Sequence, residues 1–270
     1  MLREADRDRY LACLLSPQDK RGSLAALYAF NAEIARVRDV IREPLPGEIR
    51  LQWWRDLLEG QERGDSGGNP VAAALMAAID RHNLPRQPLV DMVDARIFDL
   101  YDDPIADRNT FEGYAGETAS ALIQLASLIL SPDHAAGGAD VAGHAGVAQA
   151  VAGALLLLPI HRSRGQLYLP LDILSATGLD RNTFLTGTDR PRVAAAIEAF
   201  AGLGMEHLAK ARKAGPVHAD VFAAYLPLAS TGSILDRASR LGAGALDGGL
   251  QPAQWRRQLR MMQAAFRKRF

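Results

Sequence analysis

The sequence predicts an all-α protein folded as one helical bundle. Residues 25–43 carry apolar side chains every three or four positions, the pattern of an amphipathic helix. Residues 143–158 are apolar on nearly every side, which is typical of a helix in the middle of a bundle. No segment alternates apolar and polar residues as a strand does, and no linker requires a second domain. Residues 1–270 are therefore expected to form a single domain.

Proline and glycine divide the first half of the chain into its expected helices. Ser16 and Pro17 separate a helix at residues 3–15 from the one beginning at residue 18, which Pro44 and Pro46 end. The glycine-rich residues 60–70 are expected to form a loop. Further helices are expected from near residue 48 and at residues 71–83, 87–101 and 111–130, the last capped by Asn109 or Thr110.

The second half shows the same alternation of helices and breaks. A loop is expected at residues 132–140, and an extended stretch follows Gly165. The expected helices are residues 172–177, residues 191–215 with a break at Gly202 and Gly204, residues 217–240 split or kinked by Pro227, and residues 252–270 after a loop at 242–249.

Composition and charge narrow the function classes. The net charge of +0 argues against general nucleic-acid binding. Cys13 is the single cysteine, so no disulfide within the chain and no cysteine zinc site are expected, which fits a reducing compartment. The charged N-terminus does not resemble a signal or transit peptide, and no apolar window is long enough to span a membrane. We expect a cytoplasmic protein whose membrane contact, at the inner membrane, is peripheral.

Two short motifs carry a family resemblance. Tyr28-Ala29-Phe30 and the segment RGQLYLP at residues 164–170 resemble the YAF and RGRxYLP motifs of the squalene/phytoene synthase family of head-to-head prenyl transferases. YAFNAEIARVRD, RLQWWRDLL and PIHRSRGQLYLPLDIL resemble a divergent branch that includes a mitochondrial complex I assembly factor. The resemblance covers residues 10–175 and implies a helical bundle of the isoprenoid synthase type, with two acidic helix faces opposed across a cavity.

The aspartate motifs of that family are degraded here. In the register of the resemblance, the first motif falls on Ala35, Arg36 and Asp39, and the second on Leu157 and His161. Carboxylates four residues apart on a helix converge on one ion, and Mg²⁺ needs one or two of them besides substrate phosphates. We therefore expect no metal site and no cofactor, and Mg²⁺ only if the chain is an active transferase. Asp39 is interpreted as a salt-bridged surface acid.

The resemblance also implies ligand-binding residues. The candidates are Arg36, Arg38, Tyr114, Arg162, Arg164 and Tyr168. The basic run from His161 to Arg164 is either an anion pocket that needs no metal or a cationic helix C-terminus. The small residues at 114–120 (YAGETAS) either admit a lipid chain or pack two helices closely.

Three other groups leave alternatives open. The acidic side chains between Asp94 and Asp103 form either a metal site or a solvated helix end. Five scattered histidines show no ligand-like spacing: His82, His134, His144, His207 and His218. An apolar stripe in the last helix, surrounded by arginines, either packs on the bundle or lies in a membrane interface. The stripe is formed by Trp255, Leu259, Met262, Phe266 and Phe270.

Two function classes follow. The first is a non-catalytic protein of the prenyl-synthase fold that acts as an assembly or scaffolding factor or binds a lipid. The resemblance to the divergent branch implies respiratory complex I as the complex that is assembled. The protein's partner is then a membrane-complex subunit or an anionic lipid. The second is an active prenyl transferase that makes a squalene-like or phytoene-like product. The loss of both aspartate motifs favours the first class.

Overall fold

The all-α fold class is confirmed. The computed structural model describes residues 1–41, 43–61 and 68–270, and none of these residues forms a strand. Most of the loop predicted at residues 60–70 lies outside the described residues. The helices of the first half are α1 (Leu2–Ala5), α2 (Arg7–Leu14), α3 (Arg21–Ala35), α4 (Val37–Val40), α5 (Pro44–Leu58), α6 (Pro70–His82), α7 (Gln87–Ala95), α8 (Arg108–Ala115) and α9 (Ala121–Leu130).

The second half is also helical, with short 3₁₀ segments between the longer elements. Its α-helices are α10 (Pro132–Ala135), α11 (Ala139–Leu156), α12 (Leu158–Ser163), α13 (Leu171–Ala176), α14 (Arg181–Thr186), α15 (Arg190–Ala214), α16 (Thr231–Leu241) and α17 (Gln254–Arg267). Among the described residues, 3₁₀ segments include η2 (Phe98–Leu100), η4 (Ala136–Gly138), η5 (Phe222–Ser230) and η6 (Gly242–Asp247), and η3 (Gly116–Ser120) is a π-helix.

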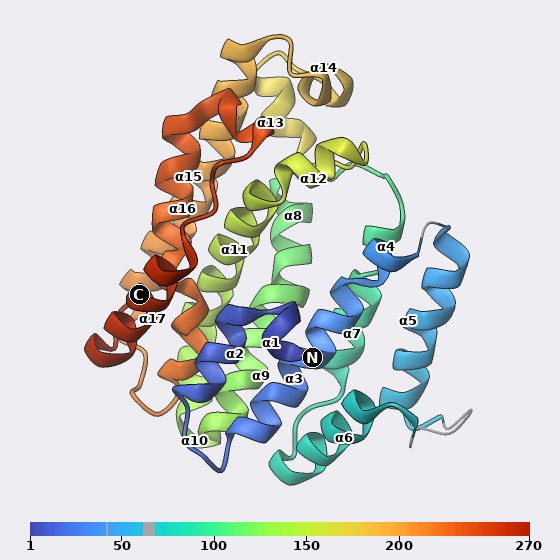
Figure 1. The fold of residues 1–270 in the computed structure, drawn as a ribbon, viewed down its shortest axis with the longest axis vertical. Coiled ribbons are helices and arrows are strands. Elements are labelled where there is room, and N and C mark those ends of the chain that lie inside the picture. The colour runs from blue at the N-terminus through green and yellow to red at the C-terminus, as the bar shows by residue number, and fades with distance from the viewer. Residues whose placement is uncertain (42, 62–67) are drawn as a thin grey trace.

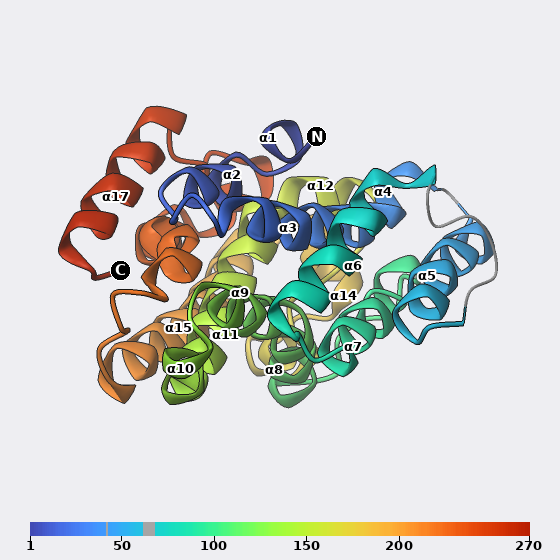
Figure 2. The ribbon, with the colours of Figure 1, turned by 90° about the horizontal axis from the view of Figure 1, so that it is seen from below.

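Helix α11 is the centre of the bundle, as its all-round apolar surface predicts. It packs against α15, η3, α9 and α16. Figures 1 and 2 show it between the α15–α16 pair and the helices of the first half. One core cluster lies among α3, α5, α6, α7 and α9, and a second joins the end of α11 to α13, α15 and α16. Because α11 contributes to both clusters, it joins the two halves of the core.

Several predicted helix ends are wrong, and local chemistry explains why. Residues 3–15 form two helices because the Asp6 side chain accepts a hydrogen bond from the Arg9 amide and caps α2. The helix predicted to end at Pro44 and Pro46 ends at Ala35, and the short α4 follows it, whereas Pro44 begins α5, since proline is tolerated in a first helical turn. Asp107, not Asn109 or Thr110, caps α8. The predicted split at Pro227 is confirmed, because Pro227 lies in η5 and α16 follows.

The predicted break in α15 does not occur. A Cβ atom at Gly204 would lie 2.8 Å from Leu235 Cδ2 and 3.0 Å from Val151 Cγ1, so this glycine allows close packing of α15 on α16 and α11. Gly146 of α11 plays the same part toward η3. A Cβ atom there would lie 2.4 Å from the Ser120 backbone nitrogen. Tight helix packing therefore accounts for Ser120 in the small-residue segment 114–120.

Candidate functional site

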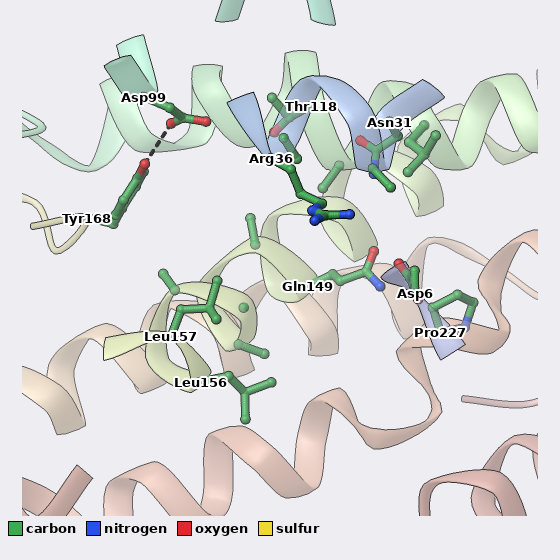
Figure 3. Close-up of a pocket in the computed structure, with 18 of the residues that line it drawn as sticks. Asp6, Asn31, Arg36, Asp99, Thr118, Gln149, Leu156, Leu157, Tyr168 and Pro227 are labelled. Carbon is green, nitrogen blue, oxygen red and sulfur yellow. Dashed lines mark hydrogen bonds between the residues drawn. The ribbon is translucent and has the colours of Figure 1, made fainter. Parts of the chain in front are cut away.

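The elements around α11 line an open cavity of about 500 Å³. Its walls come from α1–α4, α8–η3, α11–α12 and the η5–α16 junction, and Figure 3 shows part of this lining. Four aspartates and six arginines line it: Asp6, Asp8, Asp39, Asp99, Arg9, Arg36, Arg38, Arg96, Arg164 and Arg257. Another part of the wall is apolar and includes Ala119, Leu122, Ala150, Gly153 and Leu156. The cavity therefore offers both a charged and an apolar surface to a ligand.

The degraded first motif lies at a break between two helices. Helix α3 ends at Ala35, and α4 begins at Val37, with Arg36 between them. Ala35, Arg36 and Asp39 all line the cavity. Figure 3 shows the Arg36 guanidinium pointing into the cavity toward Gln149. The structure thus brings all three residues of the motif to one wall.

The degraded second motif forms the facing part of the wall. Leu157 separates α11 from α12, where Pro159 occupies the first helical turn. Leu157, His161 and Arg164 line the cavity. Arg164 Nη1 donates to Asp39 Oδ1 at 2.5 Å, so the two relic motifs meet through an ion pair. This contact agrees with the interpretation of Asp39 as a salt-bridged acid and with the prediction that the two motifs face one another.

Each aspartate in the cavity wall has an arginine partner. Besides the Asp39–Arg164 pair, the nitrogen–oxygen distances are 2.5 Å for Asp6–Arg9, 3.4 Å for Asp8–Arg257 and 3.0 Å for Asp99–Arg96. Arg38 pairs with Asp102, outside the lining, at 3.3 Å. Arg36 has no carboxylate partner among the described residues, so its charge is available to an anion.

Asp99 is the centre of a buried hydrogen-bond network. Its Oδ1 accepts from the hydroxyls of Tyr168 at 2.7 Å and Tyr114 at 2.8 Å, and its Oδ2 accepts from Arg96 Nη1. Burial, followed by the Asp99 charge, raises the pKa of Tyr168, so its hydroxyl remains a donor. Asp99 is only 7% exposed, so the interpretation of the acidic cluster as a solvated helix end is wrong for this residue.

Arg96 carries the positive charge of this network. Burial lowers its pKa, but Tyr114 and Asp99 more than compensate, and the pKa of Arg96 is raised. Arg96 Nη1 also donates to the Tyr114 hydroxyl at 2.6 Å. Arg96, Asp99, Tyr114 and Tyr168 therefore form a polar wall joined by internal hydrogen bonds, in which the Arg96 Nε is buried without a hydrogen-bond partner among the described residues.

The basic run from His161 to Arg164 does not act as one anion pocket. Burial lowers the pKa of His161 to about 4, so its ring is neutral near pH 7. Arg162 does not line the cavity, because it donates to the carbonyls of Leu185 at 2.7 Å and Thr186 at 2.8 Å and pairs with Asp247. Arg164 is neutralised by Asp39. Of the ligand-binding candidates, the structure brings Arg36, Arg38, Tyr114, Arg164 and Tyr168 to the cavity, but not Arg162.

Both ends of the chain contribute residues that the sequence analysis did not single out. Asp6, Asp8 and Arg9 come from the α1–α2 region, and Arg257 comes from α17. Arg257 Nη2 lies 3.4 Å from Asp8 Oδ1, which joins α17 to the N-terminal part of the wall. The N-cap motif at Asp6 is visible in the sequence, but its place in the cavity depends on the tertiary fold.

The sequence model of the squalene/phytoene synthase family matches residues 2–263. The chain belongs to this family. Among curated proteins, it is 32% identical to "NADH dehydrogenase (ubiquinone) complex I, assembly factor 6" of Rattus norvegicus, over 100% of this chain and 81% of the relative. It is 34% identical to the Homo sapiens protein of the same name, over 89% of this chain and 72% of the relative.

Solved structures share the family fold. A dehydrosqualene synthase in complex with ligand superposes with a TM-score of 0.79 at 19% identity, over 98% of this chain and 93% of that one. Squalene synthase HpnC from Alicyclobacillus acidocaldarius superposes with a TM-score of 0.71 at 18% identity, over 89% and 90% of the two chains. At these identities, the likeness supports the fold alone.

The Mg²⁺ ions that the family resemblance implies do not fit the donors of this cavity. Leu157 and Arg36 cannot ligate a hard cation, and the carboxylate of Asp39 is bound to Arg164. Among the described residues, no residue of the cavity wall belongs to a cluster of three or more metal-ligating side chains. The arginines instead favour an anion held directly, without metal.

The Asp99 network is expected to stabilise the fold strongly. Asp99→Asn retains the shape of the side chain but leaves the mostly buried Arg96 charge uncompensated, so we expect the free energy of unfolding to fall by about 3 kcal/mol. The control is Asp102→Asn, which breaks a more exposed pair with Arg38 and is expected to cost less than about 1 kcal/mol. Urea unfolding measures both, and equal losses would contradict the network's role.

Proposed function

We propose that this protein is a non-catalytic assembly factor for a respiratory membrane complex of the complex I type, and that its cavity binds an amphipathic anion. One observation carries the proposal: the last carboxylate of the two aspartate motifs, Asp39, is neutralised by Arg164 across the cavity. A diphosphate-leaving reaction in this family needs metal charge at that place. The curated relatives, which bear the name of a complex I assembly factor, support the assembly role.

The cavity retains the properties of a binding site although its metal donors are lost. Arg36 presents a positive charge, and a planar guanidinium binds phosphate or carboxylate oxygens in pairs. The apolar wall formed by residues such as Leu122, Ala150 and Leu156 suits a hydrocarbon chain. A bound lipid with an anionic head at Arg36 would satisfy both surfaces of the cavity.

Replacement of Asp39 distinguishes assembly from prenyl transfer. In a deletion strain of the source organism, we expect reduced NADH:quinone oxidoreductase activity that the wild-type gene and Asp39→Asn restore equally. Restoration by Asp39→Asn is expected because the carboxylate holds no metal and because its pair with Arg164 is well exposed, so that loss of the pair costs little stability. The purified protein, given farnesyl diphosphate, Mg²⁺ and NADPH, is expected to release no diphosphate above background. Turnover that Asp39→Asn abolishes would instead identify an active prenyl transferase.

The anion site predicts a specific effect of Arg36. Arg36→Gln removes the cavity's unpaired charge, and the loss of a charge-assisted contact of about 1.5–3 kcal/mol weakens retention of an acidic lipid by roughly tenfold or more. Native mass spectrometry of protein purified from cells measures this retention. Arg162→Gln is the matched control, because Arg162 lies outside the cavity. Equal retention in both variants would remove Arg36 from the site.

The C-terminal helix α17 provides a surface for membrane contact. Met261 and Ala264 are buried against α2 and η5, whereas the opposite face carries an exposed apolar stripe. Its members are Trp255, Leu259, Met262 and Phe266, with exposed fractions of 61%, 43%, 50% and 91%. Phe270 leaves the stripe and stacks on Tyr225 at 5.8 Å. Of the residues in the predicted stripe, only Phe270 is therefore explained by packing on the bundle.

Exposed arginines lie beside this stripe, which favours an anionic lipid surface over other apolar partners. Arg256 and Arg267 are exposed on α17, whereas Arg260 donates to Ser233 of α16, and no acidic residue follows Asp247. Each basic residue near such a surface contributes about 1 kcal/mol to binding. Within the described ranges, no helix is long and apolar enough to cross a bilayer. We therefore extend the proposal to peripheral attachment at the inner membrane through α17.

Vesicle flotation tests this attachment. Phe266→Ser is expected to weaken binding to vesicles with anionic lipid by about tenfold or more, since burial of a phenylalanine contributes about 1.5–3 kcal/mol. The fold should be unaffected because Phe266 is 91% exposed. The control is Ile49→Ser, an exposed apolar residue on α5, which Figure 1 places on the other side of the molecule from α17. Unchanged flotation of Phe266→Ser would show that the stripe does not attach the protein to the membrane.

A further inference from the structure

Two histidines that are far apart in the sequence meet at the surface, away from the cavity. His134 belongs to α10, and His218 lies in the connection between α15 and η5. Their rings stack with centroids 3.5 Å apart and planes 7° apart. Asp220 completes the group, with its Oδ2 at 3.4 Å from His134 Nδ1 and 3.5 Å from His218 Nδ1. This is the group of metal-ligating side chains found within 4.8 Å of one another in the described part of the chain.

The separations of these donors suit a tetrahedral ion. A zinc ion with bonds of about 2.0–2.2 Å to nitrogen and oxygen holds its ligand atoms about 3.3–3.5 Å apart. The distances from Asp220 Oδ2 to the two histidine nitrogens, 3.4 Å and 3.5 Å, lie within that interval. Two imidazoles and one carboxylate are also donors that Zn²⁺ and neighbouring transition metals accept. Water would complete the coordination, since all three side chains are exposed.

To bind an ion, the two histidines would exchange their present contacts for it. His134 Nδ1 lies 3.0 Å from Ser131 Oγ, and His218 Nδ1 accepts from the Asp220 amide at 3.3 Å. An ion must lie near the plane of each ring, so at least one ring has to turn out of the parallel stack. Both side chains are more than two-fifths exposed, which gives them room to turn. Ser131, at the start of α10, then remains beside the site.

We propose that His134, His218 and Asp220 form a surface site for Zn²⁺ or a similar divalent transition metal. The ion would link α10 to the α15–η5 connection, two segments that the chain brings together from different parts of the bundle. Because the ion would bind only the folded arrangement, it would stabilise the fold by mass action. The site is independent of the cavity and of the proposed assembly role.

Calorimetric titration of Zn²⁺ into the full chain, without a polyhistidine tag, tests the site. We expect one Zn²⁺ per chain, a rise in melting temperature with Zn²⁺, and the visible absorption of tetrahedral Co²⁺ when Co²⁺ replaces it. His134→Gln and Asp220→Asn should each weaken Zn²⁺ binding by more than about tenfold, since even the loss of a group that only supports a ligand costs that much. Both positions are exposed, so the variants should fold.

Two controls separate this site from incidental binding. Asp133→Asn removes the exposed acid beside His134, and His82→Gln removes a histidine that contacts Ser23 elsewhere in the bundle. Both should bind Zn²⁺ as the unmodified chain does. Absence of binding, or binding that His134→Gln and Asp220→Asn leave unchanged, would overturn the proposal.

Discussion

Charge pairing inside the cavity is the constraint on which the rest of this structure depends. A cavity of about 500 Å³ in the helical bundle is lined by ten charged side chains, and the mostly buried ones among them, such as Arg96 and Asp99, are costly unless they are paired. The Asp39–Arg164 contact joins α4 to the end of α12, and Asp99, paired with Arg96, joins the tyrosines of α8 and the RGQLYLP segment. The pairs that neutralise the cavity therefore also link its walls.

This pairing shows how the family fold accommodates two degraded aspartate motifs. A carboxylate that serves a metal must be free of competing cations, whereas here each lining aspartate is held by an arginine. Helix α11 packs through apolar and small residues on α15, α16, η3 and α9, and another of its faces lines the cavity. The residues that line the cavity can thus change without rebuilding the core.

The fold was largely predictable from the sequence because it rests on local patterns. Helical spacing and the apolar surface of α11 correctly indicated an all-α bundle, and Pro227 correctly marked a split. Helix ends were less predictable, since Asp6 and Asp107 act through capping bonds that several nearby polar residues can make equally well. The break expected at Gly204 failed because a glycine can serve close packing instead of ending a helix.

The site was only partly predictable because its contacts join distant residues. The motif register placed Arg36, Asp39 and His161 at the cavity, but periodicity cannot indicate that Asp39 would meet Arg164, 125 residues away. The sequence pattern places Asp99 among several acidic residues at a helix end. Its burial could not be predicted, because it depends on contacts with Tyr114 and Tyr168. Arg162 is adjacent to a lining residue in sequence, yet a helix turns it toward Leu185.

The contact between Asp8 and Arg257 has a consequence for the order in which the structure forms. These residues belong to α2 and α17, and both line the cavity. Contacts of such long sequence separation form late in folding. The part of the cavity wall that α17 supplies is thus completed after the helices around it have assembled.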